Sequence, residues 1–120
     1  KTINDCYGHN IGDKALEAIG KAIKLAIRKE DIAIRYGGDE FTVIFNDITF
    51  ETAYGISDRI KNMLNSLQIL SNEREIVELS ISIGLCSNKP KDSLEDLFKR
   101  ADELLYKAKK SGKNALCYQD

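Results

Sequence analysis

The sequence reads Ile32-Ala33-Ile34-Arg35-Tyr36-Gly37-Gly38-Asp39-Glu40-Phe41-Thr42-Val43-Ile44-Phe45 across its most informative segment. Residues 32–36 and 41–45 are rich in β-branched and aromatic side chains, which predicts two strands. The glycine pair between them predicts a hairpin turn, because glycine readily adopts the positive φ that a tight primed turn needs.

Helical periodicity flanks this hairpin on both sides. Residues 1–13 are rich in turn formers and predict a loop, and a helix is expected from Lys14, with Asp13 as its N-cap, fading near residues 29–31. A second amphipathic helix is expected over about residues 50–67.

The remaining elements complete an α+β pattern. An alternating run over residues 76–85 predicts one strand, residues 93–110 predict a helix capped by Ser93 and Gly112, and residues 115–118 predict a closing strand. This order predicts one sheet with helices packed against it. Such a sheet normally starts with a strand before the first helix, so one strand is expected to be missing before Lys1.

Composition narrows the function classes. The chain has 120 residues, a net charge of −1 and 42% hydrophobic residues, which is typical of one compact soluble domain. This charge argues against a broad nucleic-acid or membrane surface, so neither nucleic acid nor membrane contact is expected. Three widely spaced cysteines and one histidine indicate neither a disulfide framework nor a zinc site, and the cysteines are interpreted as small thiols in a reducing cytosol.

Two adjacent carboxylates follow the glycine pair. Asp39 and Glu40 repel each other unless water or a cation screens them, and hard cations such as Mg²⁺ share carboxylate oxygens with substrate phosphates. The hairpin tip therefore suits a metal and phosphate site. An ordinary exposed hairpin is the alternative, because turn chemistry alone explains these residue types.

Four sequence blocks that span nearly the whole chain carry a resemblance to a known family. They are Ile3-Asn4-Asp5-Cys6-Tyr7-Gly8-His9-Asn10-Ile11-Gly12-Asp13, Arg35-Tyr36-Gly37-Gly38-Asp39-Glu40-Phe41, Leu79-Ser80-Ile81-Ser82-Ile83-Gly84, and Arg100-Ala101-Asp102-Glu103-Leu104-Leu105-Tyr106-Lys107-Ala108-Lys109-Lys110-Ser111-Gly112-Lys113-Asn114. In this order the four blocks resemble the GGDEF domain family.

The resemblance implies a single GGDEF domain over residues 1–120. Its fold would be α+β, a ferredoxin-like or nucleotidyl-cyclase (palm-like) arrangement with an antiparallel-type central sheet, here without its first strand. Its activity would be that of a diguanylate cyclase, which joins two GTP molecules into cyclic di-GMP and releases two pyrophosphates. Two domains would face each other as a homodimer, and Mg²⁺ (or Mn²⁺) would neutralise phosphate charge.

The resemblance also implies roles for individual residues. Asp39 would bind the metal, and Glu40 would bind metal or activate the 3′-hydroxyl; which of the two handles the proton stays open. Guanine would be read by Asn4 and Asp13, although a loop turn and a helix N-cap are their alternatives. The nucleotide would lie along Gly37 and Gly38, with its phosphates held by Lys109 and Lys113.

The phosphate lysines have a simpler interpretation as well, since cations complement the dipole at the end of a helix. Lys107 and Lys110 are expected to have only that role. Lys113 replaces a common arginine of the family, which changes a bidentate grip into a point charge.

A product site is implied by Arg28-Lys29-Glu30-Asp31, an RxxD sequence directly before the hairpin. In the family this position binds cyclic di-GMP and inhibits the enzyme, and a guanidinium suits that task because it forks onto phosphate. Arg59 is a weaker candidate for the same site, with a solvated helix face as its alternative.

One departure from the family affects the metal site. The family carries a D-x-D-x-FK pattern in its first strand, of which only Lys1 remains here, so the isolated 120-residue chain is expected to be inactive. A catalytically inactive module that binds cyclic di-GMP or GTP is the alternative function, and a nucleotide-free structural domain is a third. A cytoplasmic location, with a possible membrane tether elsewhere in the parent protein, and an upstream sensory or receiver domain are also expected.

Overall fold

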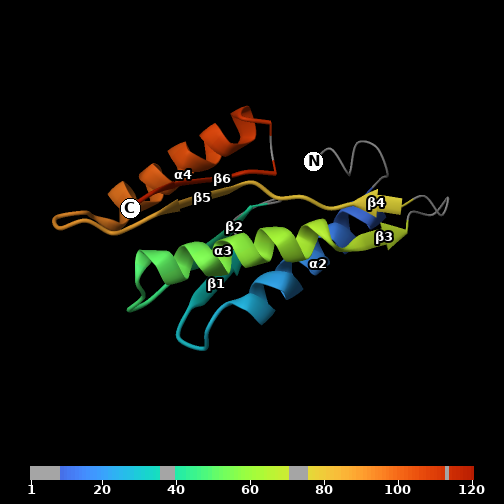
Figure 1. The fold of residues 1–120 in the computed structure, drawn as a ribbon, viewed down its shortest axis with the longest axis horizontal. Helices are drawn as coiled ribbons and strands as arrows, with labels where there is room; N and C mark the ends of the chain where they lie inside the picture. The colour runs from blue at the N-terminus through green and yellow to red at the C-terminus, as the bar shows by residue number, and fades with distance from the viewer. Residues whose placement is uncertain (1–8, 36–39, 71–75, 113) are drawn as a thin grey trace. The chain divides into compact units, whose positions relative to one another are not determined.

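The computed structural model describes residues 9–35, 40–70, 76–112 and 114–120 (Figure 1). The elements follow the order α2, β1, β2, α3, β3, β4, β5, α4, β6, which confirms the α+β class. The chain divides into two compact units, one of Lys1–Ile48 with Asn62–Leu79 and one of Thr49–Lys61 with Ser80–Asp120. No helix among the described residues combines the length and apolar character needed to cross a bilayer.

The hairpin predicted from the sequence is present in the first unit. Strands β1 (Ile32–Arg35) and β2 (Phe41–Ile44) pair antiparallel, from Ile32 opposite Ile44 to Arg35 opposite Phe41. Figure 1 shows this pair in teal beside the blue helix α2. The described ladder ends at Arg35 and Phe41, so the predicted turn at Gly37-Gly38 lies outside the described residues.

Helix α2 (His9–Ala26) begins earlier than expected, which corrects the predicted start at Lys14. Asp13 is therefore an exposed residue inside the helix and not its N-cap. The reason is burial: Ile11 is 0% exposed and Ala15 is 4% exposed, one turn apart on the same face. This apolar face outweighs the turn preference of the glycine and asparagine near it.

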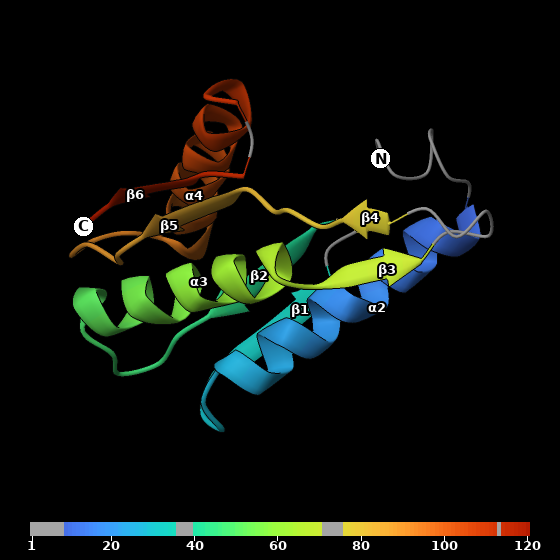
Figure 2. The same cartoon turned by 45° about the vertical axis from the view of Figure 1, so that its right-hand side comes forward.

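A second short ladder was not predicted. Strands β3 (Gln68–Leu70) and β4 (Ile76–Glu78) pair antiparallel, and β3 also contacts α2 (Figure 2). The single strand predicted over residues 76–85 is wrong, because residues 79–82 form no strand. The two halves of that run pair with different partners, β3 and β6, so one continuous ladder does not form.

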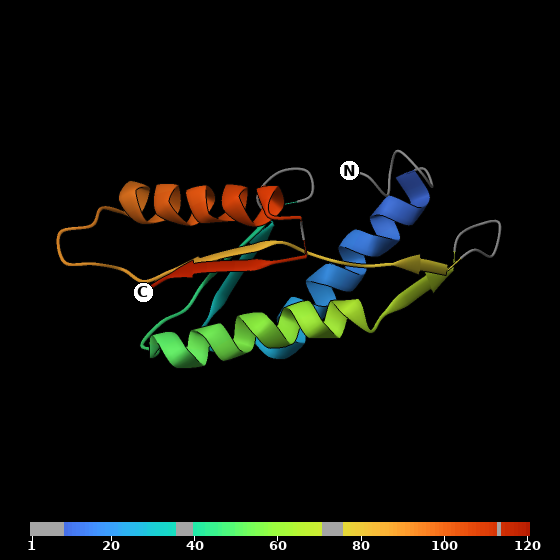
Figure 3. The same cartoon turned by 45° about the horizontal axis from the view of Figure 1, so that its top comes forward.

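The second unit contains a parallel strand pair covered by a helix. Strands β5 (Ile83–Cys86) and β6 (Leu116–Gln119) run parallel, and α4 (Leu94–Lys110) connects them and contacts both (Figure 3). A parallel pair needs such a crossover, and a helix is the usual one. The described strands thus form three two-stranded ladders, two antiparallel and one parallel, where one sheet was expected.

Capping signals set the ends of α4 as predicted. The Ser93 side chain accepts from the Asp96 backbone N–H, and the Asp96 side chain accepts from the Ser93 backbone N–H, which is a complete capping box. At the other end Ser111 is the C-cap residue, and Gly112 follows with φ of 109°. A positive φ there explains why glycine ends this helix.

Helix α3 (Phe50–Asn65) begins in the second unit and ends in the first. Its buried residues are Ala53, Ser57, Ile60 and Leu64, which lie three or four positions apart on one face of the helix. The Ser57 hydroxyl donates a hydrogen bond to the Ala53 carbonyl at 2.8 Å, so this buried polar group has a partner.

Candidate functional site

Glu40 is the signature carboxylate that the structure describes. It stands directly before β2 and is half-buried. Gly37, Gly38, Asp39, Asn4 and Lys113 lie outside the described residues. Among the residues that are described, no group of three or more metal-ligating side chains gathers.

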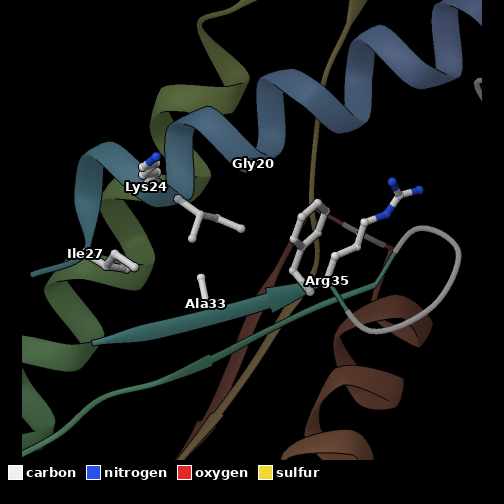
Figure 4. Close-up of a pocket in the computed structure, with 7 residues that line it drawn as sticks. Gly20, Lys24, Ile27, Ala33 and Arg35 are labelled. Atoms are coloured by element: carbon white, nitrogen blue, oxygen red, sulfur yellow. The ribbon is translucent and has the colours of Figure 1, made fainter. Parts of the chain in front are cut away.

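A pocket of about 420 Å³ lies in the first unit between α2 and the hairpin (Figure 4). Its walls are mostly apolar, and its two cations are Lys24 from α2 and Arg35 from β1. Gly20 on α2 also lines the pocket, and a Cβ placed there would make an ordinary van der Waals contact with the Phe41 ring at 3.9 Å. The pocket therefore lies between α2 and both strands of the hairpin.

Arg28 and Asp31, the two RxxD residues of the predicted product site, are joined directly. The Arg28 guanidinium donates from Nε to Asp31 Oδ2 at 3.0 Å and from Nη2 to Asp31 Oδ1 at 2.8 Å. The Arg28 backbone N–H also donates to Asp31 Oδ2 at 2.8 Å. The Asp31 side chain is 0% exposed, whereas the Arg28 side chain remains 30% exposed. The α2–β1 connection thus encloses the carboxylate of Asp31 and pairs it with Arg28.

Electrostatics follow from this geometry. The hydrogen bond from Arg28 holds the pKa of Asp31 below its ordinary value, although burial opposes that shift. The same hydrogen bond raises the pKa of Arg28. Both groups are therefore charged at neutral pH, and each is the main partner of the other.

The second unit holds α4 in place by two features. Gly84 on β5 lies so close to the helix that a Cβ there would stand 2.3 Å from the Ala101 carbonyl oxygen. Arg100 on α4 donates from Nη2 to Asp92 Oδ2 at 2.7 Å and to the Ser87 carbonyl at 2.6 Å. The hydrogen bond from Arg100 to the Asp92 carboxylate lowers the pKa of Asp92.

Other predicted site residues are exposed on helices. Asp13 is exposed on α2 in the first unit, whereas Lys109 on α4 and Arg59 on α3 are exposed in the second unit. Burial raises the pKa of the Cys86 thiol, which keeps it protonated and agrees with its interpretation as a small packing residue.

Sequence reasoning assigned no role to Asn46, Arg100 or Gly84. Asn46 binds the Arg28–Asp31 pair from 15 to 18 positions away, so no local pattern could have identified it. Arg100 and Gly84 stood inside two of the recognised sequence blocks. That placement was the available signal, but it did not say what they contact.

The chain is similar in sequence to known proteins along nearly its whole length. A sequence model described as "Diguanylate cyclase, GGDEF domain" matches residues 1–115. Diguanylate cyclase A of Treponema denticola is 39% identical over 115 residues, which are 95% of this chain and 31% of that protein. Response regulator PleD of Caulobacter vibrioides is 40% identical over 118 residues, 97% of this chain and 26% of that protein.

A solved structure extends the likeness to the fold. The GGDEF domain of DgcB from Caulobacter crescentus, crystallised in complex with c-di-GMP, is 27% identical with a TM-score of 0.92. The match covers 98% of this chain and 70% of that one. The curated relatives are longer, and this chain spans about a third or less of their length. The match to the family model over residues 1–115 nevertheless shows that the chain belongs to the GGDEF family.

Proposed function

We propose that the protein is a diguanylate cyclase and that residues 1–120 form its single GGDEF domain. The reaction joins two GTP molecules: each 3′-hydroxyl oxygen forms a bond to the α-phosphorus of the other nucleotide, each α–β phosphoanhydride bond breaks, and two pyrophosphates leave. Two protons leave the hydroxyls. The observation that carries this proposal is the unaltered signature between the two strands of an antiparallel hairpin.

The metal is proposed to be Mg²⁺ or Mn²⁺, held by the carboxylates of Asp39 and Glu40. Hard carboxylate oxygens suit either ion, and a bound cation would neutralise phosphate charge. Asp39 and Glu40 are also the proposed catalytic residues. Support comes from the donor chemistry of the pair and from the start of β2 directly after Glu40.

Nucleotide binding is proposed at the residues that match the family pattern for it. Asn4 and Asp13 would hydrogen-bond the guanine edge, and Lys109 and Lys113 would hold phosphates. Gly37 and Gly38 would let the backbone approach the ligand, because a Cβ is absent there. Asp13 and Lys109 are exposed, so their side chains are accessible to a nucleotide.

Assembly and regulation belong to the proposal too. Catalysis would need a homodimer, because each domain binds one GTP, and an upstream sensory or receiver domain would control pairing. Cyclic di-GMP would bind Arg28 and Asp31, with Arg59 as an additional arginine, and would inhibit the enzyme. We place the domain in the cytoplasm, in keeping with the free thiols of Cys86 and Cys117.

A second candidate function is binding without catalysis. The retained Arg28 and Asp31 favour it, because the same two side chains would bind cyclic di-GMP even in a domain that makes none. The retained Asp39 and Glu40 favour the enzyme.

One assay separates the two functions. Intact protein is incubated with GTP and Mg²⁺, and cyclic di-GMP and pyrophosphate are quantified by chromatography, with Asp39→Asn as the catalytic variant. The enzyme predicts product from the wild type only. A receptor would bind cyclic di-GMP in calorimetry and form none. The expectation that residues 1–120 alone are inactive stays a prediction, and the same assay on that fragment tests it.

A further inference from the structure

Asn46, just after β2, is fastened to the α2–β1 connection by three hydrogen bonds. Its side-chain Nδ2 donates to the Glu30 carbonyl at 2.8 Å, and its backbone N–H donates to Asp31 Oδ1 at 3.3 Å. Its own carbonyl accepts a hydrogen bond from Arg28 Nη2. We call Asn46 with Arg28, Glu30 and Asp31 the Asn46 latch.

The latch uses most of the donors that Arg28 could offer to a ligand. Nε and Nη2 both donate inside the cluster, and Nη1 lies 3.9 Å from Glu30 Oε2. A guanidinium grips a phosphate by donating two parallel N–H bonds to it. A phosphate can take that grip from Arg28 only by displacing Asp31 or the Asn46 carbonyl.

Displacement is opposed by the burial of Asp31. Its side chain is 0% exposed, so a carboxylate that lost Arg28 would be a buried charge with fewer partners. The backbone N–H groups of Arg28 and Asn46 would be its remaining hydrogen-bond donors. Asp31 and the Asn46 carbonyl therefore compete with any anion for Arg28. The hydrogen bond from Asn46 Nδ2 to the Glu30 carbonyl stabilises the closed state, in which Arg28 is bound to Asp31.

We propose that Asn46 is a positioning residue that holds Arg28 closed on Asp31 and thereby weakens the binding of cyclic di-GMP at this site. The identity of the ligand rests on the proposed function. The ligand binds the open state, so its apparent affinity falls by the fraction of molecules that are open.

Asn46→Ala tests the latch, because it removes the bond to Glu30 and leaves the backbone N–H and carbonyl. Asn46 is exposed, so the truncation takes no packing from the core. The expected result in calorimetry of the intact protein with cyclic di-GMP is a Kd lower by about two- to tenfold, the range of one neutral hydrogen bond. Asn46→Ser also shortens this side chain, and its Kd for cyclic di-GMP is expected to fall as well.

The matched control is Asn88→Ala, which truncates an exposed asparagine of the second unit, whereas Asn46 belongs to the first. It should leave the Kd unchanged, and Arg28→Ala should abolish binding. If the wild type binds and both Asn46 variants bind equally or more weakly, the latch is wrong and the product site stands. If neither the wild type nor the Asn46 variants bind cyclic di-GMP, the product site itself is wrong and the latch falls with it.

Discussion

Gly84→Ala probes how closely α4 packs on β5. A Cβ at this position would stand 2.3 Å from the Ala101 carbonyl oxygen, 2.4 Å from the Leu105 nitrogen and 3.0 Å from the Leu104 carbonyl carbon. All three atoms belong to the helix backbone, so no side-chain rotation relieves the clash. The helix must retreat by about 1 Å to restore an ordinary contact near ~3.5 Å.

That retreat loosens a packed layer. Leu104 and Ala108 on α4 are 7% and 0% exposed, so their contacts weaken when the helix moves. Overpacking typically costs about 1–3 kcal/mol, and we expect the upper end here because backbone atoms are struck. The free energy of unfolding should therefore fall by about 3 kcal/mol.

Urea unfolding followed by circular dichroism measures this loss. The matched control is Gly55→Ala on α3, where a Cβ would meet nothing within 4 Å. Alanine has the higher helix propensity, so this control should gain about 0.5–1 kcal/mol. If Gly84→Ala were as stable as the wild type to within about 0.5 kcal/mol, the close approach of α4 to β5 would be wrong.

Two further predictions concern caps and charges. Ser93→Ala removes the capping box and should cost about 1 kcal/mol in urea unfolding, while Ser93→Asp should retain most of that stability; equal loss in both would contradict the cap. Because the pKa of Asp31 is lowered, its stabilisation is present above the ordinary aspartate range and is lost as the pH falls through the lowered pKa. The stability gap between wild type and Asp31→Asn should therefore shrink below about pH 4, and a constant gap from there down to about pH 2 would refute the ion pair.

Local signals predicted the hairpin and α4 well. Both strands of the hairpin formed within a residue of the expected bounds, since β-branched runs beside glycines leave few alternatives. Ser93 began its helix as predicted because a capping box is a contact between near neighbours in sequence.

The remaining features depended on contacts that sequence periodicity does not report. Burial of Ile11 drew α2 past the predicted start at Lys14, and pairing with β3 and β6 split one predicted strand in two. The Asn46 latch joins positions 15 to 18 apart. In the candidate site, the RxxD pattern identified Arg28 and Asp31, but it could not identify Asn46, which contacts both from 15 to 18 positions away.

The most direct test of the proposed function is formation of cyclic di-GMP from GTP and Mg²⁺ by the intact protein. The wild type should release two pyrophosphates for each cyclic di-GMP, and Asp39→Asn and Glu40→Gln should each reduce the rate at least about 100-fold. All three proteins should unfold at similar urea concentrations. A folded wild-type protein that binds cyclic di-GMP but forms none from GTP would contradict the assignment and identify a receptor.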